Sequence, residues 1–334
     1  SLTIACTKGV STMISIQGKK ISTKEKPFII AEMSGNHNGS IDKAIALVDC
    51  AAKAGVDAIK LQTYTADTLT LNIKSDEFMV LDPNSIWYGK SLYELYSEGS
   101  TPWKWHEEII ARASQKGLIC FSSPFDISAV DFLETLNISA YKIASSEIID
   151  HELINYVAKT GKPMIISTGM ATLSEIAEAI EVCHLAGNKN IALLQCTASY
   201  PTSPENSNIR TIPNMREVFG CEVGLSDHTM GVGAAVGAVA LGATIIEKHF
   251  TLNRSDGGID AAFSLEPNEL AQLVVETERV NLALGKVFYG PSQSEISGRN
   301  YRRSLYASED IKVGEIFTRE NVRSIRPGFG LHPK

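Results

Sequence analysis

The stretch that decides the fold is PFIIAEMSGNHNGSIDKAIALVDCAAKAGVDAIKLQ, which runs from residue 27 to residue 62. It begins with an apolar, β-branched run at 27–33 and ends with a second such run at 56–62. Between them, residues 41–54 carry apolar side chains at helical spacing, and Gly55 follows as a typical helix terminator. A strand, an amphipathic helix and a second strand predict a βαβ unit with parallel strands.

Six further apolar runs follow along the chain. They cover residues 118–123, 140–145, 163–168, 191–197, 222–227 and 244–250. Amphipathic helices are expected between them, for example at 173–186 before Gly187, and after the last run at 268–284. Eight strands that alternate with helices are the pattern of a TIM barrel. We therefore predict an α/β fold with a TIM (β/α)8 barrel at residues 27–285, preceded by an N-terminal extension at 1–26.

Two segments depart from the regular barrel pattern. The connection at about 63–101 is far longer than most strand-to-helix loops, so we expect it to be a lid or an interface segment. After the barrel, a Gly/Ser/Asn-rich linker at 286–300 leads to a tail at 301–334 that is expected to form a few short strands. Such a tail is too small to bury a core unaided. It should pack on its own barrel or on a partner subunit.

Composition excludes several classes of protein. The 334 residues are 44% hydrophobic, and the formal net charge is -7 without a cluster of Lys and Arg. Neither nucleic acid nor an anionic membrane is therefore an expected partner. The six cysteines are scattered without a C-x-x-C pair, as in a reduced protein. The N-terminus shows no signal-peptide pattern, and no apolar run approaches the roughly 20 residues that span a bilayer. We expect a cytoplasmic enzyme.

Polar residues end almost every predicted strand, which is where TIM barrels build their active sites. Lys60 and Lys142 lie inside apolar runs, where an unpaired ammonium group would be costly to bury. With nearby hydroxyls they could form a set of donors for one phosphate and one carboxylate. These hydroxyls belong to Ser123, Ser145, Ser167 and Ser226. The alternative is that each lysine pairs with a neighbouring barrel glutamate.

Two histidines end the last two strands, which are neighbours in a closed barrel. His228 and His249 can therefore meet over the barrel mouth and bind a divalent metal, although imidazoles in such places are also common hydrogen-bonding partners. Two histidines with few carboxylates would leave coordination positions open, which favours Mn²⁺, Mg²⁺, Co²⁺ or Zn²⁺ as a Lewis acid. Asp260, in a Gly-rich loop after the last strand, is either a further ligand or a turn residue. Glu32, at the end of the first strand, either handles protons and sugar hydroxyls or pairs with Lys60.

Four aromatic residues, Tyr93, Tyr96, Trp103 and Trp105, offer either a sugar platform or ordinary packing.

The motifs at the strand ends resemble those of the sialic acid synthase family from about residue 27 to the C-terminus. The matching segments are FIIAEMSGNHNGS, AIKLQTY, CFSSPF, AYKIASSE, PMIISTGM, CTASYPT, GLSDHT and IEKHF. The tail, with SLYASEDIKVGE and IRPGFGLHPK, is similar to the small antifreeze-like (SAF) domain of that family, and SLYA and FGLHPK most resemble the pseudaminic acid synthase branch. The chain ends at Lys334, so by this resemblance we expect the small domain to be truncated.

The resemblance implies a reaction and a set of site residues. Members of the family condense phosphoenolpyruvate with an acylated amino-sugar to give a nine-carbon sugar acid and phosphate. His228 and His249 match the metal-binding histidines, usually with Mn²⁺, and Glu32 and Glu147 match active-site carboxylates. Contacts to phosphoenolpyruvate are implied for Lys60, Ser123, Lys142, Ser145, Ser167 and Ser226, and pocket positions for Gln62 and Tyr200. The small domain is exchanged across a homodimer in the family, which implies that Arg326 reaches the acyl-sugar in the partner's barrel.

One departure from the family pattern bears on the substrate. Ala198 stands where N-acetylneuraminate synthases have Asn, which removes an amide from the pocket. We expect a pseudaminic acid synthase, with N-acetylneuraminate, legionaminate and spore-coat polysaccharide synthases as alternatives. A barrel synthase that uses a sugar phosphate would need further basic residues. A sugar-binding barrel without turnover is the non-enzyme alternative.

Overall fold

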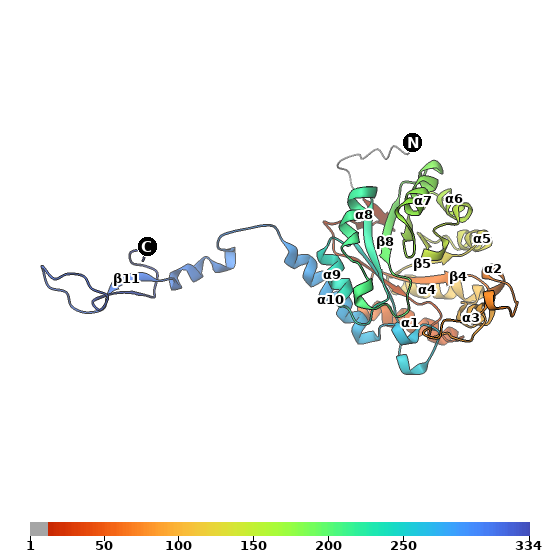
Figure 1. Ribbon diagram of the computed structural model, residues 1–334, viewed down its shortest axis with the longest axis horizontal. Coiled ribbons are helices and arrows are strands. Elements are labelled where there is room, and N and C mark those ends of the chain that lie inside the picture. Colours follow the sequence, from red (N-terminus) through yellow and green to blue (C-terminus); the bar gives the residue numbers. More distant parts are fainter. Residues whose placement is uncertain (1–12) are drawn as a thin grey trace. The chain divides into compact units, whose positions relative to one another are not determined.

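Residues 13–334 are described by the computed structural model of the chain. They fall into two compact units, the first ending at Leu284 and the second spanning Gly285–Lys334. The first unit is a closed barrel of eight parallel strands surrounded by helices (Figure 1). No helix in the described part of the chain is long and apolar enough to cross a membrane.

The barrel strands coincide closely with the eight predicted runs. They are β3 (Phe28–Glu32), β4 (Ala58–Thr63), β5 (Ile119–Pro124), β6 (Tyr141–Ile143), β7 (Met164–Ser167), β8 (Ile191–Cys196), β9 (Glu222–Asp227) and β10 (Ile245–His249). The order around the barrel is β10-β3-β4-β5-β6-β7-β8-β9, so the last strand closes on the first. The predicted TIM barrel is confirmed.

Helices alternate with the barrel strands, and most of them cover the outside of the barrel. They are α1 (Ile41–Ala54), α2 (Ala66–Leu69), α3 (Leu92–Gly99), α4 (His106–Gln115), α5 (Ile127–Thr135), α6 (His151–Ala158), α7 (Leu173–Leu185), α8 (Thr211–Phe219), α9 (Gly233–Ala240) and α10 (Pro267–Leu284). Local sequence sets their ends. In α1 the Ser40 side chain accepts a hydrogen bond from the Lys43 N–H, and Gly55 ends the helix at φ 85°, a conformation that glycine adopts without strain.

Strand alternation divides the buried side chains into two sets. One set points outward and packs between strands and helices, as Ile29, Val223 and Ile246 do. The other fills the barrel interior, as Ile30 and Ile245 do. Residues two positions further along each strand also point inward. This alternation turns the polar residues at the strand ends toward one another.

A β-hairpin closes the bottom of the barrel. Strands β1 (Ile14–Ile16) and β2 (Lys19–Ile21) pair through a two-residue turn whose residues, Gln17 and Gly18, both have positive φ. Three isoleucines of the hairpin, Ile14, Ile16 and Ile21, are buried in the same cluster as the barrel interior. Only an N-terminal extension was predicted here, although the alternation in ISIQGKKI, residues 14–21, is typical of a hairpin.

The long connection after β4 is not a bare loop, because α2 and α3 lie within it.

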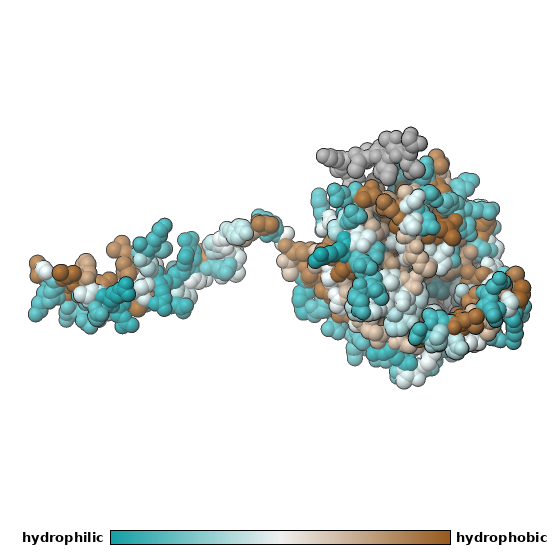
Figure 2. Space-filling view, viewed as in Figure 1, coloured by the Kyte–Doolittle hydropathy of each residue, from teal (hydrophilic) through white to brown (hydrophobic). Residues whose placement is uncertain are grey.

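In the second unit, β11 (Ser304–Ala307) and β12 (Val322–Ile325) form an antiparallel pair, which agrees with the predicted small β domain. Apolar side chains lie exposed on this unit, interspersed with polar ones (Figure 2); they include Val313, Ile316, Phe317, Phe329 and Leu331.

Candidate active site

Four charged side chains meet inside the barrel near the C-terminal ends of its strands. Lys60 forms an ion pair with Glu32, and its Nζ lies 3.8 Å from Oε1 of Glu247. The Nζ of Lys142 lies 3.9 Å from the same Glu247 oxygen. All four side chains are at most 5% exposed. Glu247, on β10, therefore lies near two ammonium groups, one from β4 and one from β6.

Both predicted lysines thus have glutamate partners, and the expected pairing of Glu32 with Lys60 is present. Burial raises the pKa of Glu32 to about 7, although Lys60 opposes the shift. Burial lowers the pKa of Lys142, and the charge of Glu247 only partly offsets this effect. Burial would also raise the pKa of Glu247, but the two ammonium groups outweigh it and the net pKa is lowered. The cluster therefore contains charged groups, and one of its carboxyl groups, that of Glu32, can gain a proton near neutral pH.

The predicted serine hydroxyls lie around this cluster. Ser123 Oγ accepts a hydrogen bond from Lys60 Nζ at 3.2 Å, and Ser226 Oγ donates to Glu247 Oε1 at 3.3 Å. Ser145 Oγ accepts from the N–H of Gly169 at 3.0 Å. Ser167 Oγ is buried without a hydrogen-bond partner among the described residues. Buried hydroxyls in a packed core usually have a hydrogen-bond partner, so an unpartnered one is a feature expected of a binding site.

The two predicted histidines come together at the same mouth. The ring centroids of His228 and His249 lie 5.3 Å apart. The His228 Nδ1 lies 3.0 Å from the carbonyl oxygen of Thr197, which makes it the donor and leaves Nε2 free to bind a ligand. His249 Nδ1 is buried without a hydrogen bond, and Oδ2 of Asp260 lies 3.7 Å away.

These side chains fit a divalent metal. Burial, followed by the charges of His228 and Lys60, holds the pKa of His249 well below its usual range, so its lone pairs stay available. Between residues 13 and 334, no group of three or more His, Cys, Asp or Glu side chains has the arrangement of a metal site. A site built on the two imidazoles therefore leaves several coordination positions open. The Asp260 side chain accepts a hydrogen bond from Ser34.

A cavity of about 360 Å³ opens above the cluster. Its polar lining includes the predicted residues Gln62, Ser145, Glu147, Tyr200, His249 and Asp260. Burial raises the pKa of Glu147 to about 7, and its Oε2 has no hydrogen-bond partner among the described residues. The rest of the lining is largely apolar and comes mainly from the long connection, namely Leu69, Val80, Leu92 and Leu95. A few polar groups within apolar walls are typical of a pocket for a small molecule.

Aromatic side chains cover one side of this cavity. The Tyr200 ring lies 4.4 Å from the His228 ring and 5.6 Å from the Trp87 ring, measured between centroids. Of the four aromatic residues considered from the sequence, Tyr96 lines the cavity. Trp103 instead stacks on Phe132 at 4.8 Å.

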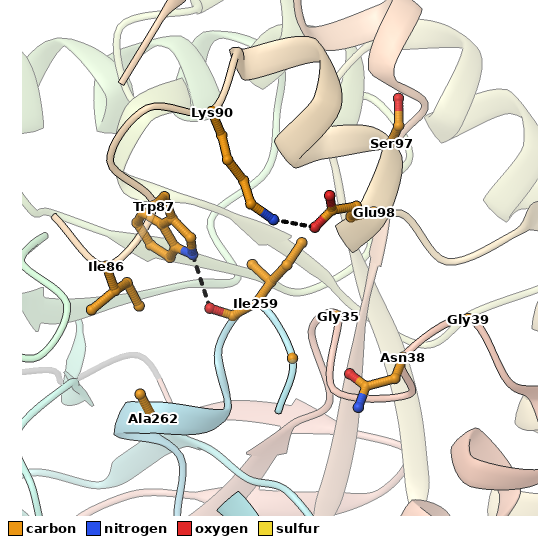
Figure 3. Close-up of a pocket in the computed structure, with 11 residues that line it drawn as sticks. Gly35, Asn38, Gly39, Ile86, Trp87, Lys90, Ser97, Glu98, Ile259 and Ala262 are labelled. Atoms are coloured by element: carbon orange, nitrogen blue, oxygen red, sulfur yellow. Dashed lines mark hydrogen bonds and ion pairs between the residues drawn. The ribbon is translucent and has the colours of Figure 1, made fainter. Parts of the chain in front are cut away.

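Trp87 lines both this cavity and a second one of about 650 Å³, which is shown in Figure 3. Its indole N–H donates to the carbonyl oxygen of Ile259 at 2.9 Å, and both residues line both cavities. The long connection is thus tied to the loop that carries Asp260. Figure 3 also shows the ion pair between Lys90 and Glu98 in the second cavity.

Sequence reasoning missed two residues of the site. Glu247 was not among the predicted site residues, although its place beside Lys248 and His249 in a polar strand end was a usable signal. Trp87 gave no local signal, because it lies in an irregular segment. Arg326 belongs to the second unit, where its side chain is exposed.

Comparisons with known proteins show the family of this chain. A model of the NeuB family matches residues 47–289. The chain is 45% identical to the pseudaminic acid synthase of Campylobacter jejuni subsp. jejuni serotype O:23/36 over 313 residues, which cover 94% of this chain and 91% of that protein. It is 41% identical to the pseudaminic acid synthase of Helicobacter pylori, over 93% of this chain and 91% of that protein.

A solved structure shares the architecture. The N-acetylneuraminic acid synthetase of Leptospira borgpetersenii serovar Hardjo-bovis, in complex with citrate, superposes with a TM-score of 0.77 at 32% identity. The match covers 87% of this chain and 96% of that one. With a family model over most of the barrel and relatives above 40% identity over nearly the whole length, this chain belongs to the NeuB family of sialic acid synthases.

Proposed function

We propose that this chain condenses phosphoenolpyruvate with an acylated amino-sugar aldehyde and water, giving a nonulosonic acid and phosphate. The sugar is 2,4-diacetamido-2,4,6-trideoxy-L-altrose, which makes the enzyme a pseudaminic acid synthase. One observation carries the proposal. Two buried ammonium groups and two adjacent imidazoles meet directly below a cavity of sugar size. The pseudaminic acid synthases among the relatives support the choice of sugar.

Phosphoenolpyruvate is proposed to bind at the lysine cluster. Lys60 and Lys142 supply the positive charge for its phosphate and carboxylate, and the serine hydroxyls supply hydrogen bonds. The unpartnered Oγ of Ser167 is a donor that a bound anion would satisfy. A phosphate near Glu32 would favour protonation of that carboxyl group, which is why a carboxyl with a pKa near 7 suits this position.

The metal is proposed to be held by His228 and His249, with Mn²⁺ expected and Mg²⁺, Co²⁺ or Zn²⁺ as alternatives. The unpartnered Nδ1 of His249 and the fixed tautomer of His228 support this assignment. When bound, a divalent cation polarises and orients the sugar aldehyde as a Lewis acid. Asp260 lies on the cavity side of His249, within reach of the same substrate.

The proposed reaction requires groups that hold the two substrates and groups that transfer protons. C3 of phosphoenolpyruvate attacks the aldehyde carbon, a C–C bond forms, and the aldehyde oxygen gains a proton. Water adds to C2 and loses a proton, and the bond between C2 and the phosphate oxygen breaks to release phosphate. Glu32 is the proposed group for proton transfer or for stabilising the cationic C2, because it lies beside Lys60 within the cluster.

The sugar is proposed to occupy the cavity. Gln62, Glu147 and Tyr200 would bind its hydroxyl and amide groups, while the apolar lining from the long connection would take the acetyl methyl groups and the deoxy carbon. Ala198 leaves no amide at its position. This supports a sugar other than N-acetylmannosamine.

We also propose that the chain works as a domain-swapped homodimer in the cytoplasm. The antifreeze-like unit at 301–334, after a linker at 286–300, would carry Arg326 to the partner's cavity. Exposed apolar side chains on this unit support a packing partner. The five described cysteines are free, as expected for a reducing compartment. Light scattering of the purified chain tests the dimer, and a monomer at micromolar concentration would contradict it.

A phosphate-release assay tests the function. Purified protein, Mn²⁺ and phosphoenolpyruvate are combined with each of several acylated hexosamines. Phosphate release is expected with 2,4-diacetamido-2,4,6-trideoxy-L-altrose and not with N-acetylmannosamine. Lys142→Met should abolish release, while Lys104→Met, a lysine outside the site, should not. Release with a legionaminic or N-acetylneuraminic precursor alone would move the assignment to that synthase, and sugar binding without release would indicate a binding protein.

A further inference from the structure

A second buried ion pair lies directly behind the two histidines. Asp227 and Lys248 are each the neighbour of one histidine in the sequence, and they are Cα partners in the register of β9 and β10. Strand alternation turns both away from the barrel interior, whereas His228 and His249 point into it. The Lys248 Nζ lies 3.0 Å from Asp227 Oδ2, and each side chain is 1% exposed.

The pair also holds the residue that follows His228. Lys248 Nζ donates a hydrogen bond to the carbonyl oxygen of Thr229. Asp227 Oδ1 accepts one from the N–H of the same residue at 2.9 Å. Both polar groups of the Thr229 backbone are thus fixed from the outer side of the barrel.

Inner contacts hold the same turn from the other side. The His228 carbonyl oxygen accepts a hydrogen bond from the Thr202 N–H at 2.9 Å, and its Nδ1 donates to Thr197. His228 therefore has its backbone held from both sides and its ring oriented by one carbonyl group. Lys248, which precedes His249, is thus bonded to the backbone of Thr229, which follows His228.

Stability alone does not account for this pair. Two fully buried charges lose much solvation, and replacing such a pair with apolar residues of similar volume is often neutral or stabilising. What the pair does provide is a fixed offset between the ends of β9 and β10. A metal held by few protein ligands is sensitive to small displacements of each ligand.

We propose that Asp227 and Lys248 are positioning residues that set the separation of His228 and His249 for binding a divalent metal. This inference rests on the metal site of the proposed function. Neither residue touches substrate or metal, because both face the helices outside the barrel. Their effect is on metal affinity, and the phosphoenolpyruvate site at Lys60 and Lys142 should be indifferent to them.

The test is metal binding by the full chain, measured by titration calorimetry with Mn²⁺. The double variant Asp227→Asn with Lys248→Met removes both charges at similar volume. We expect it to fold and to bind Mn²⁺ with a Kd about 10- to 100-fold higher than the unmodified protein. Binding of phosphoenolpyruvate without metal should be unchanged, whereas general structural damage would weaken both ligands.

A matched control exists at the opposite end of β9. Arg216 and Glu222 form an ion pair of 2.7 Å between α8 and the strand start. The variant Arg216→Met with Glu222→Gln should leave the Kd for Mn²⁺ unchanged. Lys248→Arg, which keeps the charge and the donors, should bind Mn²⁺ more tightly than the double variant, and Asp227→Asn alone provides a milder change if the double variant is unstable.

Each outcome decides the inference. Weaker Mn²⁺ binding with intact phosphoenolpyruvate binding supports it. Wild-type Mn²⁺ affinity in the folded Asp227→Asn/Lys248→Met variant, or in Asp227→Asn if the double variant is unstable, overturns it and leaves the proposed function standing. Absence of Mn²⁺ binding by the unmodified protein overturns the metal part of the proposed function and this inference together.

Discussion

The buried carboxyl group of Glu147 predicts a measurable cost to stability. It lies in a short 3-10 helix, Ser145–Glu147, that follows β6 and faces the cavity. Its Oε2 has no hydrogen-bond partner among the described residues, and none of the ion pairs found in residues 13–334 involves it. Burial is the largest cause of its raised pKa, and a hydrogen bond from its own backbone and the charge of Lys142 only partly oppose the shift. Ionisation of a carboxyl group in such a place destabilises the folded protein, and groups of this kind are concentrated at functional sites.

The magnitude follows from the shift in the pKa. The carboxyl group has an ordinary pKa of 4.5 and a pKa of about 7 in the folded protein. That difference of roughly 2.5 pKa units, at about 1.4 kcal/mol each, gives at most about 3 kcal/mol, because partial exposure screens the charge. The folded protein binds the proton more tightly than the unfolded chain. Proton binding by Glu147 therefore stabilises the folded protein fully below about pH 4.5, and this stabilisation is lost as the pH rises through about 7.

Glu147→Gln removes this titration and keeps the size of the side chain. At pH 8 the variant should be more stable than the unmodified protein by up to about 3 kcal/mol, and the two should converge near pH 4.5. Urea unfolding followed by tryptophan fluorescence between pH 5 and pH 8 measures the difference. The exposed Glu152→Gln should show no such trend. A Glu147→Gln variant with the same pH dependence as the unmodified protein, or with lower stability at pH 8, would refute the reasoning.

Three further perturbations test other parts of the structure. Lys60→Met leaves Glu32 without its ion-pair partner and leaves Glu247 with Lys142 alone, so it should lower the free energy of unfolding by about 3–5 kcal/mol; adding Glu32→Gln should recover part of this in urea unfolding, and no recovery would argue against the pair. Ile16→Ala in the hairpin that closes the barrel should cost about 2–5 kcal/mol, since the side chain is fully buried, whereas Ser15→Ala on its exposed face should change stability by less than about 0.5 kcal/mol. Trp87→Phe removes the hydrogen bond to Ile259 and should raise the KM for the sugar about 3- to 10-fold with little change in the KM for phosphoenolpyruvate. Equal changes in both KM values would mean that Trp87 does not act on the sugar cavity alone.

Local sequence was sufficient for the barrel and for most of the candidate site. Apolar runs with helical segments between them determine where strands and helices lie, and the cap residues Ser40 and Gly55 fix the helix between the first two strands. Within a strand, the two-residue period decides which side chains share a face. Once Lys60 and Lys142 are placed in barrel strands, their meeting inside the barrel follows from this period and from closure.

Other features depend on contacts between segments far apart in the chain. Glu247 comes between the two lysines only because β10 closes on β3, and no local pattern fixes the distance across a barrel. Trp87 reaches Tyr200 and Ile259 from an irregular segment, where neither period applies.

The sequence by itself therefore determined the barrel, the strand-end residues and their common direction, because these follow from the spacing of apolar side chains along each segment. The tertiary structure alone decided which charges pair, which carboxyl group stays unpaired, and how the hairpin and the long connection close the two ends of the barrel. Those outcomes depend on distances between segments, which residue spacing within one segment does not set.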